Sequence, residues 1–501
     1  MKPIMNIKKI YYSICLMLSG IVAANAQVCQ PHSLYFMETI PQISQMNPAF
    51  QPRANGFVAL PLNVNLDVRL PLAMKDILQK RGDRVYSFLE RPYDYDKFWR
   101  TIGENSTLML NVGVDLDILG FGFRVGKSYL TVGLSEHIIS NNALPSDIFK
   151  LTDRGFPREE TLFNFSNLGT QTIAYKQVRI GFSTKINDHL TIGVNIKPLS
   201  GQLAAVSKIN KMELRTSQQK WSLEAKSDVY SSAPVDIILD EDGKISKTEQ
   251  RELENKDYLK NYFTSFHNPG IAVDLGASYQ FNERFNVSAS LNNLGFISWK
   301  KDLNGISANG DFEFHGIEYD IVNDDGKDMW ETLSDTLKNV VKYNVQHDKF
   351  KTPLTPVLHL GATYNFTKSV SFGFLSRTAF WQNNVQQSFN VSFCLQPYSF
   401  VAFNMGATWL VNSNVYFGGG LTFFIGPLQI YALTDYAPAY YSMYTIEKNN
   451  EDKDTGREQI VKIPYPERQK TVTFRIGVNL VFGKHGYVNK PMLDTSKNNM
   501  K

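Results

Sequence analysis

The sequence predicts an all-β fold: a transmembrane antiparallel β-barrel of about fourteen strands, with an N-terminal plug-like segment and helical insertions in long extracellular loops. Three observations predict this fold class. The chain starts with an export signal, its strands alternate apolar and polar residues, and short turns alternate with long polar connections along the chain. Together they favour a closed barrel over a soluble β-sandwich, whose strands also alternate.

The first part of the chain, residues 1–26, reads as a signal peptide. Three lysines precede the apolar run IYYSICLMLSGIVA, which ends at Ala24-Asn25-Ala26. A charged start, an apolar stretch of this length and a small-x-small cleavage site are typical of secretory signals, whereas the alternative, a retained anchor helix, needs a longer span. We therefore expect an exported chain that begins at Gln27 and resides in the cell outer membrane.

The composition of the exported chain excludes several classes of protein. Cleavage removes three lysines and no acidic residue, so the formal net charge falls from +4 to +1. A near-neutral chain is not built to bind nucleic acid through bulk charge. Cys29 and Cys394 are too few for a disulfide scaffold, and they either stay as thiols or form a single bridge. Mean hydropathy is −0.25, which excludes a bundle of transmembrane helices.

Three stretches, residues 179–198, 274–293 and 359–378, share one strand–turn–strand pattern. In each, a polar residue and x-Gly-x-x open an alternating run, a short polar turn follows, and a second alternating strand completes the pair. Alternation with period two gives a strand two different faces. The apolar face often ends in Tyr or Phe beside the turn, and strands of about ten residues match a tilted membrane span.

Counting such pairs gives the architecture. Six tight hairpins supply twelve strands, and a first strand near 56–68 and a last near 470–482 make fourteen. We expect the hairpins at 109–137, 172–198, 271–293, 356–379, 387–411 and 415–436. Their turns are predicted at Gly126-Lys127, Asn187-Asp188, Asn282-Glu283, Thr367-Lys368, Gln396-Pro397 and Gly426-Pro427. Short turns on one side and long loops on the other are the periplasmic and extracellular sides of a bacterial barrel.

These features divide the chain into four parts. After the signal peptide, residues 27–55 form a periplasmic or plug segment, residues 56–482 form the barrel with large loops at 199–270 and 294–355, and residues 483–501 form a polar tail.

The segment before the first strand contains Asn47-Pro48-Ala49. Pro48 fixes its own φ and pushes Asn47 toward extended geometry, while Asn47 can bond its local backbone. Such a rigid corner suits a segment that plugs a polar lumen, and a plain turn before the first strand is the alternative.

The last predicted strand carries an assembly signal. Arg475, Gly477, Leu480 and Phe482 stand in an alternating run with an apolar end. This run resembles the C-terminal signal that the barrel assembly machinery reads, and an ordinary amphipathic strand is the alternative. Arg475 and Asn479 are expected to face the lumen, and Leu480 and Phe482 the lipid.

The segments SLYFMETIPQISQMNPAFQPR, LTPVLHLGATYNF and YFGGGLTFFIGPLQIYALTDYAP resemble a family of predicted outer-membrane barrels found mainly in the Bacteroidetes. The Asn47-Pro48-Ala49 segment is similar, more distantly, to that of FadL-type transporters and PorV-like barrels. The resemblance implies a fourteen-stranded barrel with its N-terminal segment folded inside. FadL-type proteins pass hydrophobic molecules, whereas PorV-like proteins shuttle or scaffold secreted proteins.

One loop stretch, DIILDEDGKISKTE at 236–249, is a candidate calcium site. With Gly243 at the sixth position of a calcium loop, Asp240 and Asp242 take the third and fifth and Glu249 takes the twelfth. The first position is an isoleucine, which offers no side-chain oxygen. Calcium is the single cofactor that the sequence suggests.

The alternative for this stretch is a turn that starts a loop helix. Ser246 and Glu249 match a capping box ahead of an apolar-periodic segment through Leu253 and Phe263. A looser copy at 320–332 precedes a second such segment. We expect two loop helices that cap the barrel mouth or present a docking face.

No catalytic motif is present, so the sequence predicts no enzyme. Polar residues on the inward face of the strands either satisfy one another across the lumen or line a selective pathway. We expect this set to comprise Arg179, Lys185, Asn195, Lys197, Asp274, Gln280, His359, Asn365 and Arg377, with Asn390 and Asn404.

Two functions remain open. One is a channel or carrier for small or hydrophobic molecules, and the other is a non-transporting subunit or scaffold of a secretion, assembly or surface complex. The expected partners are outer-membrane lipid, the barrel assembly machinery and other outer-membrane or secretion-complex proteins.

Overall fold

The computed structural model describes residues 31–81, 84–87, 93–155, 159–218, 220–233, 235–241, 245–250, 267–314, 341–381, 384–411, 415–437, 441–448, 459–466, 468 and 470–483. Several predictions lie outside these residues. They concern the signal peptide, Cys29, Asp242, most of the two loop helices and the tail beyond residue 483.

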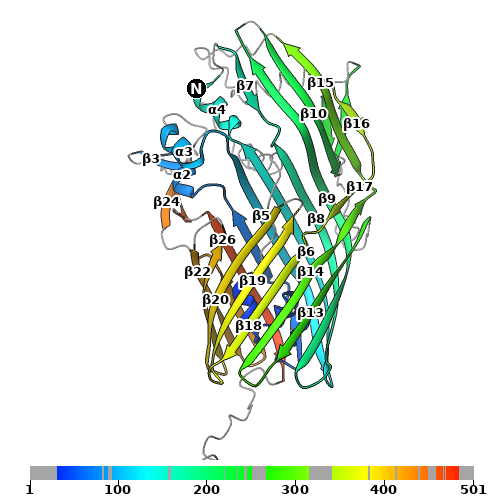
Figure 1. Ribbon diagram of the computed structural model, residues 1–501, viewed down its shortest axis with the longest axis vertical. Coiled ribbons are helices and arrows are strands. Elements are labelled where there is room, and N and C mark those ends of the chain that lie inside the picture. Colours follow the sequence, from blue (N-terminus) through cyan, green and yellow to red (C-terminus); the bar gives the residue numbers. More distant parts are fainter. Residues whose placement is uncertain are drawn as a thin grey trace, which may run out of the picture.

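In the described residues, fourteen antiparallel strands close into a barrel (Figure 1). Two short strands, β1 (Gly56–Ala59) and β2 (Asn63–Arg69), share the first position, and both pair with the second strand and with the last. The prediction of fourteen strands is therefore confirmed. The other strands are β5 (Thr107–Val125), β6 (Ser128–Pro145), β8 (Gly169–Lys185), β9 (Leu190–Thr216), β13 (Asn268–Gln280), β14 (Phe285–Trp299), β18 (Val357–Asn365), β19 (Val370–Trp381), β20 (Asn384–Tyr398), β21 (Val401–Leu410), β22 (Val415–Ile425), β23 (Leu428–Thr434) and β26 (Thr471–Phe482).

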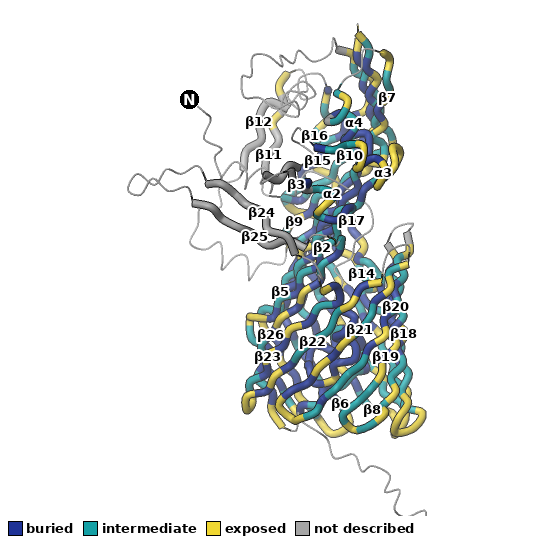
Figure 2. The backbone as a smooth tube through the Cα atoms, turned by 90° about the vertical axis from the view of Figure 1, so that its left-hand side faces the viewer, coloured by how far each residue is buried: buried dark blue, intermediate teal, exposed yellow. Residues whose placement is uncertain are grey.

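The two faces of the barrel wall differ as the alternation predicts (Figure 2). Leu360 and Phe366 point outward and are 47% and 60% exposed, whereas His359, which precedes Leu360 on β18, is buried. In β26, Phe474 and Ile476 are exposed while Arg475 is buried. The pairing of the first and last strands closes the barrel, and the period of two gives it an apolar exterior and a polar interior.

Most tight turns lie where the sequence predicts them, all at one end of the barrel. Gly126 and Gly426 have φ values of 58° and 60°, a region that glycine enters without strain. The turn predicted at Gln396-Pro397 is wrong: it lies at residues 399–400, between β20 and β21. Pro397 instead lies inside β20, where the pairing register shifts between Leu395 and Tyr398. Proline is tolerated there because a bulge leaves its missing N–H without a ladder partner.

At the opposite end the wall continues as a sheet beyond the barrel (Figure 1). β9 is 27 residues long, so the predicted connection that starts at residue 199 begins as strand. It pairs with β10 (Trp221–Ser232), which pairs with β15 (Leu303–Phe314), which pairs with β16 (Asn344–Gln346). Two more short strands, β7 (Thr161–Asn164) and β17 (Phe350–Pro353), pair with β9 and β14.

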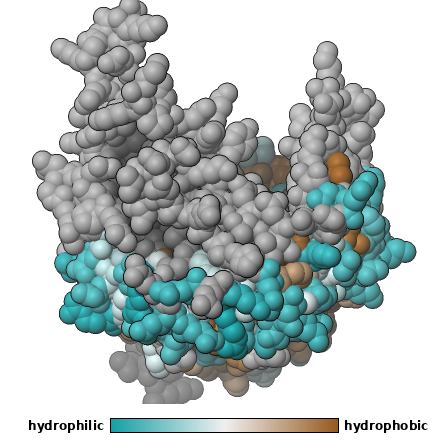
Figure 3. All heavy atoms as spheres, turned by 90° about the horizontal axis from the view of Figure 1, so that it is seen from above, coloured by the Kyte–Doolittle hydropathy of each residue, from teal (hydrophilic) through white to brown (hydrophobic). Residues whose placement is uncertain are grey.

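This extension, defined as β7, β10, β15, β16 and the part of β9 beyond residue 206, has an apolar core of its own. Phe163, Leu214, Trp221 and Leu223 are buried together with Leu151 of helix α4 (Asp147–Arg154). Its polar positions carry ion pairs such as Lys211–Glu224 at 2.6 Å. Hydrophilic atoms dominate the described surface when the molecule is viewed from this end (Figure 3).

Helices α2 (Met74–Ile77) and α3 (Tyr95–Ile102) lie beside the extension and bury a second cluster around Phe98, Trp99 and Phe149. No helix in the described ranges is long and apolar enough to cross a membrane.

Three further hairpins leave the loop end of the barrel. They are β3–β4 (Leu78–Arg81, Arg84–Ser87), β11–β12 (Val235–Leu239, Ile245–Gln250) and β24–β25 (Tyr441–Lys448, Gln459–Pro466). The capping box predicted at Ser246 and Glu249 is wrong, because both residues lie in strand β12 and not at the start of a helix. Pairing with the β-branched and apolar residues of β11 outcompetes the local helix signal.

Candidate functional site

The N-terminal segment, residues 31–50, lies inside the barrel and is called the plug here. It contains two 3-10 helices, η1 (His32–Phe36) and η2 (Pro41–Gln45), and nearly all of its side chains are buried. Pro41 stands at the first position of η2, where its missing N–H would have no helical partner anyway. In the described residues no part of the plug pairs with a wall strand. The plug is held through side-chain hydrogen bonds, several of which run from wall side chains to its backbone.

Asn47-Pro48-Ala49 is a corner of the plug pressed against the wall. The amide of Asn47 donates to the carbonyl oxygens of Ala277 and Ala289 at 3.3 and 3.2 Å, and its Oδ1 accepts from the N–H of Ala49 at 2.9 Å. A Cβ on Gly276 of the wall would lie 2.1 Å from Asn47 Oδ1. The corner therefore fits where the wall strands have no side chain.

A buried histidine joins the start of the plug to the wall. His32 Nδ1 lies 2.7 Å from Asp435 Oδ2, and Nε2 lies 2.8 Å from Ser388 Oγ. The backbone N–H of Ser33 donates to the same carboxylate at 3.1 Å. Strand β20 and the bend that directly follows β23 are thereby connected through one plug residue.

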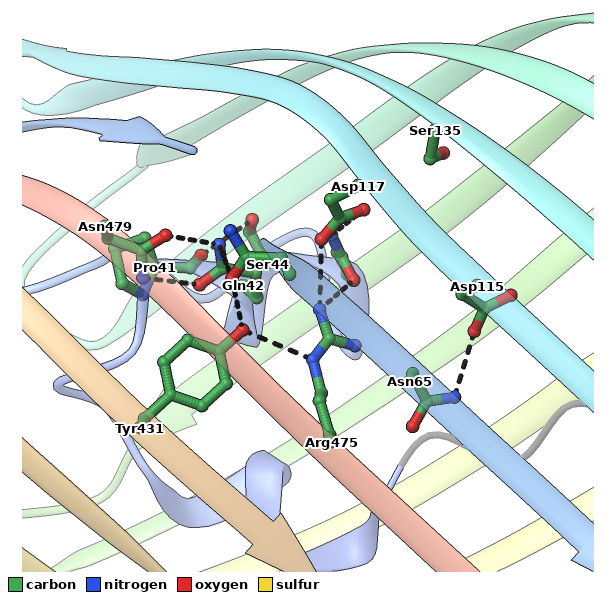
Figure 4. A network of polar contacts seen from close by, with 12 residues as sticks. Pro41, Gln42, Ser44, Asn65, Asp115, Asp117, Ser135, Tyr431, Arg475 and Asn479 are labelled. Carbon is green, nitrogen blue, oxygen red and sulfur yellow. Dashed lines mark hydrogen bonds and ion pairs between the residues drawn. The ribbon is translucent and has the colours of Figure 1, made fainter. Parts of the chain in front are cut away.

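Further along the plug, its two glutamines enter a polar network (Figure 4). Arg475 donates to Asp117 Oδ2 and to Gln45 Oε1, both at 3.1 Å, and Gln45 donates to the same carboxylate. Gln42 and Asn479 exchange two amide hydrogen bonds of 2.8 and 3.1 Å. Charge-assisted bonds of this kind fix the position of the plug relative to β26 and β5.

A polar cavity lies on the loop side of the plug. It offers about 80 Å³ to the centres of water-sized molecules, which is room for a few waters. Gln45 and Met46 of the plug form part of it, and the rest of the lining comes from Asp115, Asp117, Ser135, His137, Tyr175, Gln177, Arg179, Lys197, Asn292, Asn293, Val357, His359 and Arg377.

A second, smaller cavity of about 50 Å³ lies at the turn end. It is lined by Phe36 to Thr39 of the plug and by the 367–369 turn. The plug thus separates a loop-side cavity from a turn-side cavity.

The structure brings most of the predicted lumen residues together. Lys197 and Asn195 both contact Asp274, at 2.7 and 2.9 Å. Eight of the predicted lumen residues are buried inside the barrel. They are Arg179, Asn195, Lys197, Asp274, His359, Arg377, Asn390 and Asn404. Gln280 and Asn365 are half-buried, and Lys185 is exposed near the 186–189 turn, so these three do not belong to the central group.

Sequence reasoning missed the polar residues of the first hairpin. His137 Nδ1 lies 2.6 Å from Asp115 Oδ1, and its Nε2 lies 2.9 Å from Ser135 Oγ. The alternation within the hairpin at 109–137 predicted that these side chains face inward. The two strands of this hairpin contain few charged residues, so the sequence did not mark that face as a site. The plug residues His32, Gln42 and Gln45 carried no signal of their own.

The other predicted site residues belong to the assembly signal and to the candidate calcium loop. Gly477 and Arg475 face inward, while Leu480 is half-buried and Phe482 points outward at the end of β26. Asp240 is exposed in the β11–β12 turn, and Glu249 pairs with Asp236 further along this hairpin. Asp240 and Glu249 therefore lie at different points of a strand hairpin, whereas a calcium loop wraps its ligands around one ion. Asp242 lies outside the described residues, so calcium binding stays a prediction.

Comparison with solved structures gives matches over most of the chain at low identity. The toluene transporter TbuX of Ralstonia pickettii is 9% identical, with 89% of this chain and 94% of that chain covered and a TM-score of 0.42. The toluene transporter TodX of Pseudomonas putida is 10% identical, with coverage of 92% and 95% and a TM-score of 0.36. A FadL homologue of Pseudomonas aeruginosa is 11% identical, with coverage of 93% and 100% and a TM-score of 0.39.

No curated protein matches the chain. A family model, by contrast, matches residues 48–435, which run from the Pro48 corner of the plug to the Asp435 that holds His32. This match covers more than half of the sequence, and the chain therefore belongs to the family of unknown function DUF5723.

Proposed function

We propose that the protein is an outer-membrane channel or carrier for small molecules that its own N-terminal plug closes. The single observation that supports this most is the placement of one cavity on each side of the plug inside a closed barrel. Residues 31–50 are then the barrier that a solute has to pass. The outward belt of apolar side chains supports residence in a bilayer, because exposing such a large apolar surface to water is unfavourable.

Conductance of the purified protein in planar bilayers tests this proposal. We expect rare, brief openings for the wild-type protein and at least tenfold more open time for Asn47→Asp, because the aspartate loses both hydrogen bonds to the wall carbonyls and brings a charge against them. Asn210→Asp on the exposed surface of the extension is the matched control. Folded protein that stays silent in all three forms would end the channel proposal.

A second candidate is a scaffold that binds other outer-membrane or secretion-complex proteins. The extension supports it, because a sheet with a buried apolar core beyond the barrel is a rigid platform for a partner. Gentle extraction followed by native electrophoresis and mass spectrometry tests this function. A stable complex that dissociates when the extension is altered, together with a silent barrel, would favour the scaffold over the channel.

A further inference from the structure

The loop-side cavity contains a buried arginine that has no bonding partner among the described residues. Arg179, on β8, is 7% exposed, and its Nε makes no hydrogen bond. Within the described part of the chain, its guanidinium forms no side-chain hydrogen bond and no ion pair. A buried charge without a partner destabilises the folded protein unless an anion or water binds to it.

The acidic residues around the cavity are already engaged elsewhere. Asp115 is bonded to His137 and Asn65, and Asp117 is bonded to Arg475 and Gln45. The third carboxylate, Asp274, accepts from Lys197 and Asn195. Of the side chains that line the cavity, two are carboxylates, Asp115 and Asp117, and three are cations, Arg179, Lys197 and Arg377, so the lining has one excess positive charge when the histidines are neutral.

Two acceptor atoms in the same cavity also lack hydrogen-bond partners in the part of the chain that the structure describes. The Ser290 hydroxyl donates to the carbonyl of Met46 at 2.8 Å, so it accepts from the Nδ1–H of His359 at 3.3 Å. The other ring nitrogen, Nε2, is then an acceptor, and it has no hydrogen-bond partner. Asn292 uses its amide N–H groups on the plug carbonyls, and its Oδ1 is buried and unbonded.

We propose that this cavity binds a small hydrophilic carboxylate that also carries a hydroxyl or ammonium group, as an α-hydroxy acid or α-amino acid does. The carboxylate bonds to the Arg179 guanidinium, whose planar fork matches two carboxylate oxygens. The O–H or N–H donor of the ligand meets His359 Nε2 or Asn292 Oδ1. The small, polar cavity excludes a long hydrocarbon chain.

This inference rests on the proposed function and narrows its cargo to small polar acids in place of hydrophobic molecules. Binding and passage are separate measurements, so the two proposals fail separately. A protein that binds the acid and never conducts refutes the channel alone, whereas a conducting protein with no preference for the acid refutes the cavity assignment alone.

Calorimetric titration of the purified full-length chain with lactate, propionate, lactamide and octanoate tests the inference. We expect lactate to bind most tightly, because propionate lacks the donor group, lactamide lacks the charge and octanoate does not fit. Arg179→Gln is expected to weaken lactate binding by at least about tenfold, the loss of a charge-assisted hydrogen bond. Arg179→Lys is expected to bind with intermediate strength, since it keeps the charge and loses the fork.

Arg215→Gln, on the exposed surface of the extension, is the matched control and should bind lactate as the wild-type chain does. Arg179→Gln removes a buried charge without a partner, so this variant should fold at least as well as the wild-type chain. The heat-dependent gel mobility of the variant measures whether the barrel has folded. If lactate and lactamide bind equally, or if Arg179→Gln and Arg179→Lys leave lactate binding unchanged, water alone fills the cavity and the inference is wrong.

Discussion

At the scale of single residues, glycines in the barrel wall decide how the plug sits. A Cβ at Gly361 would lie 2.4 Å from the Tyr35 ring, and one at Gly373 would lie 2.4 Å from the Phe36 ring. At Gly193 the nearest atom is the backbone oxygen of Pro48, at 2.2 Å. The plug and the wall are therefore complementary in shape at several separate points, as in a close-packed core.

Gly193→Ala tests this fit. The added methyl group has to displace plug backbone, which we expect to destabilise the folded barrel by about 1–3 kcal/mol. Gly133→Ala, on another wall strand, is the control, since its Cβ would meet its nearest neighbour at an ordinary 3.5 Å. The measurement is the thermal midpoint of the heat-modifiable gel shift, and equal midpoints for the two variants would contradict a tight plug.

At the scale of elements, strand β9 links the barrel to the extension. It pairs with β8 and β13 in the barrel and then with β10 and β7 beyond it. Buried Leu214 packs with Phe163 and Trp221 at the far end of this strand. The extension thus has its own local stability while sharing its backbone with the wall.

Leu214→Ala separates these two stabilities. We expect it to cost the extension about 2–5 kcal/mol through the cavity it leaves, while the barrel keeps its heat-resistant mobility. Limited proteolysis should then cut near β9 and β10 much faster than in the wild-type chain. Asn210→Ala, exposed on the same strand, should be cut at the wild-type rate. Loss of the barrel together with the extension would show that the two unfold as one unit.

The elements also show what the sequence could predict. Period-two alternation predicted the strands and their faces because each wall residue meets either the interior or the exterior. The turn at 399–400 was misplaced because Pro397 reads locally as a turn residue, and a register shift in β20 accommodates it. The extension was not foreseen, because the pairing of β10 with β9 and β15 depends on residues that are distant in sequence. For the lumen site, the alternation predicted which residues face inward. It could not predict which of the inward side chains contact one another, because those contacts join strands that are distant in sequence.

At the scale of the whole molecule, the outward apolar belt and the polar extension divide the surface into two environments. Leu275, Phe374 and Leu360 are among the exposed side chains of the belt, whereas ion pairs such as Lys211–Glu224 lie on the extension. In the proposed setting, lipid covers the belt and water covers the extension.

Leu360→Arg tests this division. A charge on the lipid side of the wall is expected to destabilise the barrel by about 2–4 kcal/mol near the middle of the bilayer. Asp188→Arg, exposed in a tight turn, should leave the stability nearly unchanged. Unfolding in lipid vesicles with urea measures both variants. Equal stabilities would mean that Leu360 does not face acyl chains.

The pairing of β26 with β1 and β2 has a consequence for the order in which the protein is built. The plug is synthesised ahead of every strand, yet the first and last strands join only after the whole chain has been made. His32 of the plug bonds to Asp435, which follows 403 residues later in the chain, so this contact can form only after most of the chain has been made. The bond that fixes the start of the chain is therefore one of the last for which both partners exist.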